Sequence, residues 1–132
     1  MRRVREALAD DGGSSPVEFV LVGTLLTVLT LAVLQFGLAV YVRNIVHDAA
    51  VEGAFHAALA DTTLGDGAAR VRTILTRTVG EGYETEVSVV ERSAGGYDTV
   101  HVTVRSTLPL IGLLGVPHTM EVTADAPVES LE

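Results

Sequence analysis

An uncharged apolar stretch of 24 residues, 19–42, constrains the fold of this chain more than any other feature. It lies between Glu18 and Arg43, and within it only Gln35 is strongly polar. As a helix it would be about 36 Å long, which exceeds the hydrocarbon core of roughly 30 Å that a membrane helix must cross. A chain of 132 residues could hardly bury so long an apolar helix on every side. We therefore predict a transmembrane helix, and not a buried core helix.

The arginines predict the orientation of this helix. Arg2, Arg3 and Arg5 precede it, and Arg43 is the one arginine immediately after it. The positive-inside rule places such an N-terminus in the cytoplasm, so the chain after the helix is expected to be extracytoplasmic. A cleaved secretory signal is disfavoured, because the apolar run is too long for one and begins after 18 residues that include acids.

The junction before the helix reads D-G-G-S-S-P-V-E-F over residues 11–19. A short polar leader ends at Gly13, and Glu18 lies five residues beyond it. This arrangement resembles the prepilin peptidase site of type IV pilins and pseudopilins. The resemblance implies that a prepilin peptidase cuts between Gly13 and Ser14. It also implies that Glu18 meets the new N-terminal amine of Ser14 in a neighbouring subunit, which sets the register of assembly.

A second interpretation of Glu18 is a helix cap. Ser15-Pro16-Val17-Glu18 fits a capping box, with Ser15 as N-cap, Pro16 at the first helical position and Glu18 at the third. A glutamate in the first turn also suits the helix dipole. The two interpretations are compatible, because Glu18 can cap its own helix before assembly.

Residues 12–60 resemble the TadE-like proteins, which are pseudopilins of the tight adherence (Tad, or Flp pilus) machinery. The resemblance lies in the ordered segments V-E-F, Q-F-G, Y-V-R-N, D-A-A and E-G-A, which begin at positions 17, 35, 41, 48 and 52. Two residues depart from the family pattern: Pro16 lies close to the scissile bond, and Phe55 stands where an arginine is frequent. The resemblance implies that the partners are the prepilin peptidase, other pilins and the Tad machinery, besides the lipid bilayer.

We predict an α+β, pilin-like fold with three parts: a cytoplasmic leader over 1–13, a transmembrane segment over 14–43 and an extracytoplasmic domain over 44–132. One helix is expected to run from about 16 to 60, with a stripe of small and apolar residues on its outer half. A second helix is predicted at about 67–79, with Asp66 as its cap and Gly80 as its stop. Three antiparallel strands should follow, with a turn at residues 93–96 and the third strand at about 118–126.

The segment 108–117 is almost entirely apolar and is bounded by prolines. One interpretation is a connection between strands that covers the small core. The other is an exposed patch that touches lipid or a partner subunit, formed by Leu110, Ile111, Leu113 and Leu114.

No catalytic or metal-binding pattern is recognisable. The chain has no cysteine, and its four histidines (47, 56, 101 and 118) do not have the spacing of metal ligands on one helix face. A net charge of −8 argues against nucleic-acid binding. We therefore expect no cofactor, no metal and no enzymatic activity.

Two functions remain open from the sequence. The first is a minor pilin or pseudopilin of a Tad-type pilus or secretion apparatus, which enters the pilus or remains at its base after cleavage following Gly13. The alternative is an unprocessed, single-pass, membrane-anchored extracytoplasmic binding or accessory module.

Overall fold

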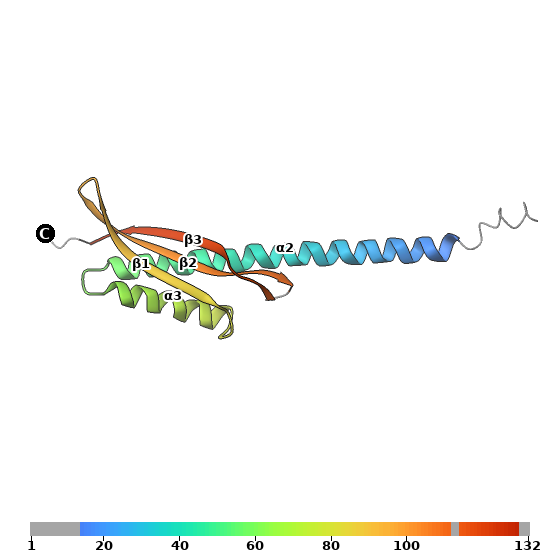
Figure 1. Cartoon of the computed structure of the whole chain (residues 1–132), viewed down its shortest axis with the longest axis horizontal. Helices are drawn as coiled ribbons and strands as arrows, with labels where there is room; N and C mark the ends of the chain where they lie inside the picture. Colours follow the sequence, from blue (N-terminus) through green and yellow to red (C-terminus); the bar gives the residue numbers. More distant parts are fainter. Residues whose placement is uncertain (1–13, 112–113, 130–132) are drawn as a thin grey trace, which may run out of the picture. The chain divides into compact units, whose positions relative to one another are not determined.

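The computed structural model describes residues 14–111 and 114–129. Their elements are, in chain order, α2 (Ser14–Ala58), α3 (Leu64–Thr78), β1 (Thr85–Ala94), β2 (Tyr97–Ile111) and β3 (Leu114–Pro127), as labelled in Figure 1. The predicted arrangement of a long apolar helix, a second helix and a three-stranded antiparallel sheet is therefore confirmed. The chain divides into two compact units, the first ending at Leu34 and the second beginning at Gln35.

Helix α2 has 45 residues and matches the single helix expected from about 16 to 60. Its one proline, Pro16, lies in the first turn, where a missing N–H removes no intrahelical hydrogen bond. The helix ends at Ala58, and the Thr62 hydroxyl then donates a hydrogen bond to the carbonyl of His56 in the last turn. Thr62 thus satisfies one of the carbonyls left unpaired at the helix end.

Helix α3 begins at Leu64, three residues before the predicted start, because its N-cap is Thr63 and not Asp66. The Thr63 hydroxyl accepts the Asp66 N–H at 3.2 Å, and the Asp66 carboxylate accepts the Thr63 N–H at 2.9 Å. This reciprocal pair is a capping box, with Asp66 at the third helical position. The hydrogen bonds from Thr63 lower the pKa of Asp66. The predicted stop is confirmed, since Gly80 follows the C-cap with a φ of +123°.

The three strands form one antiparallel sheet in the order β1-β2-β3. The turn between β1 and β2 consists of Gly95 and Gly96, with φ values of +65° and +88°. Glycine suits both positions, because this type of two-residue hairpin turn requires positive φ at each. The turn therefore lies within the predicted residues 93–96.

The β2–β3 hairpin is longer than predicted, and the segment 108–117 is not a separate connection. Strand β2 runs to Ile111 and β3 begins at Leu114, so most of the segment lies within paired strands. Strand β1 pairs with β2 only as far as Ser106. Pro109 consequently lies where β2 has a single neighbouring strand, and its missing N–H is tolerated there. The pairing of β2 with β3 has two register shifts in this part, between Ser106 and Leu108 and between Pro109 and Ile111. Gly115 lies so close to β2 that a Cβ there would be 1.7 Å from the Leu108 carbonyl oxygen.

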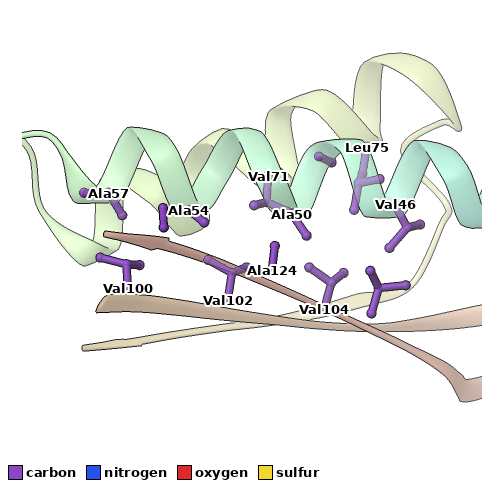
Figure 2. Packing of buried hydrophobic residues seen from close by; sticks show 14 of the residues in the cluster. Val46, Ala50, Ala54, Ala57, Val71, Leu75, Val100, Val102, Val104 and Ala124 are labelled. Atoms are coloured by element: carbon purple, nitrogen blue, oxygen red, sulfur yellow. The ribbon is translucent and has the colours of Figure 1, made fainter. Parts of the chain in front are cut away.

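The core of the second unit lies between the helices and one face of the sheet (Figure 2). Alternate residues of β2 and β3 point to this face, as the period of a strand requires. The helices contribute small and branched side chains, and the sheet contributes mainly valine and alanine. The buried hydrophobic residues of this core are Val42, Val46, Ala49, Ala50, Ala54, Ala57, Ala58, Val71, Leu75, Val100, Val102, Val104, Met120, Val122, Ala124 and Ala126.

Helices α2 and α3 approach each other through two glycines. A Cβ on Gly53 would lie 2.2 Å from Val71 Cγ2, and one on Gly67 would lie 2.7 Å from the Gly53 carbonyl oxygen. The small-residue face that the sequence placed on the outer half of α2 is thus covered within the same chain, and α3 packs against it at Gly53 and Ala57.

Candidate functional site

The first half of α2 exposes its apolar side chains on every side. Phe19, Leu25 and Leu34 are 79%, 68% and 64% exposed, and no part of the most apolar 18-residue window is buried within the chain. Among the described residues this helix is long and apolar enough to cross a membrane. Because a soluble protein rarely leaves so large an apolar surface in water, the helix fits a single-pass membrane anchor.

Three threonines interrupt the apolar surface without leaving hydroxyl groups unpaired. Thr24, Thr27 and Thr30 each donate a hydrogen bond, at 2.8 Å, to the carbonyl four residues earlier in α2. Such local bonds make threonine tolerable in hydrocarbon.

The proposed cleavage and assembly residues lie at the start of α2. The helix begins at Ser14, whereas Gly13 and the side chain of Ser14 lie outside the described part of the chain. Glu18 is exposed in the early turns of the helix. The helix begins one residue before the predicted cap Ser15, but helix ends are assigned only to within one or two residues. The capping role of Ser15, Pro16 and Glu18 therefore stays a prediction.

Gln35 attaches the β2–β3 hairpin to the helix. Its side-chain Nε2 donates a hydrogen bond to the carbonyl of Pro109 at 3.0 Å. The sequence marked Gln35 as the strongly polar residue of the apolar run and as the start of the Q-F-G segment, and predicted no contact for it. The informative signal is that Gln35, Leu38 and Val42 lie on one face at helical spacing, and the structure half-buries the first two and buries the third.

Tyr83, which precedes β1, also makes a hydrogen bond near this end of β2. Its hydroxyl donates to the carbonyl of Thr107 at 2.5 Å, and burial raises the pKa of the phenol above its ordinary value of 10.0. The nearby Ser106 hydroxyl opposes this rise in pKa. By distance and angle, however, the Ser106 oxygen is buried without a hydrogen-bond partner in the part of the chain that the structure describes.

The predicted apolar patch of this hairpin is described only in part. The side chains of Leu110, Ile111 and Leu114, and all of Leu113, lie outside the described residues. Of their neighbours with described side chains, Pro109 is buried, whereas Val116 is 49% exposed.

The E-G-A segment has a structural explanation in helix packing. The Glu52 carboxylate forms an ion pair with Arg70 of α3, Gly53 allows the close approach of α3, and Ala54 is fully buried. Phe55, which departs from the family pattern, is 57% exposed and is not part of the hydrophobic core. In this chain, Glu52 and Gly53 of the E-G-A segment contact α3, so this part of the family pattern lies at the α2–α3 contact.

The described titratable residues form no recognisable catalytic or metal centre. His101 contacts Asp125 across two strands, with Nδ1 and Oδ1 2.5 Å apart. Over residues 14–111 and 114–129, no group of three or more His, Cys, Asp or Glu side chains is placed to hold a metal ion. A surface hollow of about 390 Å³ near the end of α2 contains two carboxylates, Glu91 and Glu129, but no basic or nucleophilic side chain beyond threonine hydroxyls.

Comparison with known proteins identifies a family. Residues 13–54 match the family model described as TadE-like protein. Neither the curated proteins nor the solved structures gave a match. The matched residues include the start of α2, its exposed apolar surface and the E-G-A segment at its packed end. Residues 13–54 therefore form a TadE-like segment, and TadE-like proteins are a pilus-associated structural family.

Proposed function

We propose that this chain is a minor pilin or pseudopilin of a Tad-type (Flp) pilus or secretion apparatus. The observation that carries the proposal is the TadE-like match, which starts at residue 13 and includes the apolar helix surface that the described part of the chain leaves uncovered. In this proposal residues 1–13 are a cytoplasmic leader, residues 14–43 hold the chain in the membrane and residues 44–132 are extracytoplasmic. The role is structural, and the partners are the prepilin peptidase and other pilus subunits.

Glu18 gives the proposed cleavage a physical purpose. At the edge of the apolar run, Glu18 would bear only part of the roughly 2.5–3.5 kcal/mol that an acidic side chain costs at the centre of a membrane helix, and a positively charged partner would stabilise it there. Cleavage after Gly13 would create a new ammonium group on Ser14. In a neighbouring subunit this ammonium could pair with the Glu18 carboxylate, and the pair would fix the register of the two helices.

The test is the mass of the membrane-extracted protein, made with and without an active prepilin peptidase. We expect the peptidase to remove residues 1–13 and leave Ser14 as the N-terminus. A Gly13→Leu variant is the matched control and should remain uncut, because a site that accepts glycine before the scissile bond has little room for a large side chain.

A second prepilin, cut in the same cells, shows that the peptidase is active. If this chain then keeps Met1 as its N-terminus, the pilin proposal fails. The alternative, an unprocessed membrane-anchored accessory module, would account for that result.

A further inference from the structure

The end of the β2–β3 hairpin lies beside a part of α2 that belongs to the apolar run. We define the hairpin end as residues 108–111 and 114–117. The hydrogen bond from Gln35 Nε2 to the Pro109 carbonyl places this hairpin end level with Gln35. Arg43, the first charged residue after the apolar run, lies eight residues further along the helix. The sheet and a predicted membrane helix therefore meet inside the apolar stretch 19–42.

The length of a membrane crossing sets the level of the membrane surface. A helix rises about 1.5 Å per residue, so roughly 20 residues cross a hydrocarbon core of about 30 Å. Counted from Phe19, the first residue after Glu18, this crossing ends near Leu38. Gln35 then lies about 4–5 Å on the lipid side of that boundary. The hairpin end bonded to Gln35 lies at the same depth.

The composition of the hairpin suits this depth. Residues 106–120 contain no Asp, Glu, Lys or Arg, whereas the adjacent Arg105–Glu121 pair is exposed and joined at 2.7 Å. The opposite end of the sheet, at the β1–β2 turn, carries Arg92 and Asp98. The sheet is thus uncharged at the end that lies beside the apolar helix and charged at the far end.

The backbone limits how far the hairpin can enter lipid. Beyond Ser106, β2 pairs only with β3, so both strands leave one edge without a strand partner. Unpaired N–H and C=O groups are costly in hydrocarbon but can be hydrated among the lipid headgroups. A shallow position at the boundary of headgroups and acyl chains satisfies both the apolar side chains and the polar edge.

From these observations we propose that the hairpin end is a second membrane contact, which rests in the headgroup–acyl boundary of the lipid surface. The domain would then contact the membrane at the hairpin end as well as being anchored by α2. The inference depends on membrane anchoring by α2 and not on cleavage or pilus assembly. The uncut full-length chain in vesicles therefore suffices to test it.

The chain contains no tryptophan, so one introduced indole reports its own surroundings. The test variant is Val116→Trp, at a position that is 49% exposed and can accept a larger side chain. Phe36→Trp, at an exposed position next to Gln35, reports the depth of the helix at the same level. Tyr97→Trp, at the charged end of the sheet, is the matched control outside the membrane, where the native tyrosine is 79% exposed.

Each variant is placed in phosphatidylcholine vesicles at low protein density, with or without bromine on the acyl chains. We expect blue-shifted emission and comparable quenching by brominated lipid for Val116→Trp and Phe36→Trp, and neither effect for Tyr97→Trp. Emission of Val116→Trp like that of Tyr97→Trp would overturn the proposal. So would blue-shifted emission without quenching, because protein and not lipid would then cover the hairpin end.

Circular dichroism verifies that each variant is folded. If Val116→Trp does not fold, Val116→Cys labelled with a small environment-sensitive dye provides the same measurement, since the chain has no other cysteine. The dye should be quenched by brominated lipid at this position, and an unquenched dye would again overturn the proposal.

Discussion

Glu18 is an exposed carboxylate near the start of an apolar helix, and two physical roles are open to it. A capping role needs a hydrogen-bond acceptor, which glutamine supplies as well as glutamate in a capping box. An assembly role needs a negative charge that can pair with the Ser14 ammonium of a neighbouring subunit. A pair of substitutions can therefore separate the two roles.

We predict that Glu18→Gln and Glu18→Ala are both cut after Gly13 but are both strongly impaired in assembly. The physical reason is that neither side chain carries the charge that the Ser14 ammonium would require. The measurement is the amount of this subunit recovered in sheared pili or assembly complexes, relative to the native chain, with intact mass as the check on cleavage. Normal assembly of Glu18→Gln together with a defect in Glu18→Ala would reduce Glu18 to a helix cap.

At the scale of elements, the contact between α2 and α3 depends on glycines that leave no room for a side chain. A Cβ on Gly67 would lie 2.5 Å from the Ala57 Cβ and 2.7 Å from the Gly53 carbonyl oxygen, so the helix backbones would have to separate. Gly65, in the same helix, offers a contrast. A Cβ there would meet only the Thr63 hydroxyl oxygen, at an ordinary 3.6 Å.

We predict that Gly67→Ala lowers the free energy of unfolding by about 1–2 kcal/mol. Overpacking typically costs about 1–3 kcal/mol, and the higher helix propensity of alanine offsets up to ~1 kcal/mol of that cost. Gly65→Ala should be neutral or stabilising by up to ~1 kcal/mol, since only the propensity changes. Urea unfolding followed by circular dichroism measures both. Equal effects of the two substitutions would contradict the close helix contact.

At the scale of the whole molecule, the unit that begins at Gln35 contains its own core. Its buried residues come from the second part of α2, from α3 and from the sheet, beginning with Val42. Most of the exposed large apolar side chains of α2 lie earlier, from Val17 to Leu34. The helix surface that requires lipid thus lies mainly before Gln35, whereas the folded core lies after it.

We predict that a chain beginning at Gln35 is soluble without detergent and unfolds in a single cooperative transition in urea. It keeps the hydrophobic cluster and loses residues 14–34, which carry most of the exposed apolar surface of the helix. Size-exclusion chromatography and urea unfolding measure these properties, and the full-length chain, which should require detergent, is the control. Aggregation or gradual unfolding of the shortened chain would show that residues 14–34 are needed for folding.

Local signals in the sequence predicted most of the elements. The length of the apolar run predicted the membrane helix, and alternation of valine with polar residues predicted β2. The adjacent Gly95 and Gly96 predicted the first hairpin turn. Each of these signals acts within a few residues or along one helix. The start of α3 was misplaced because Thr63 and Asp66 form a reciprocal pair, whereas the prediction considered Asp66 alone.

The sequence by itself determined that the chain has an apolar helix too long to be buried and a TadE-like N-terminal segment. Only the tertiary structure showed where the covered part of α2 begins, that α3 fills its glycine face, and that Pro109 lies within a strand bonded to Gln35. These facts depend on residues such as Gln35 and Pro109, which are 74 positions apart in the chain. Periodicity cannot reveal such contacts, because strand register and helix packing arise from which distant surfaces fit together.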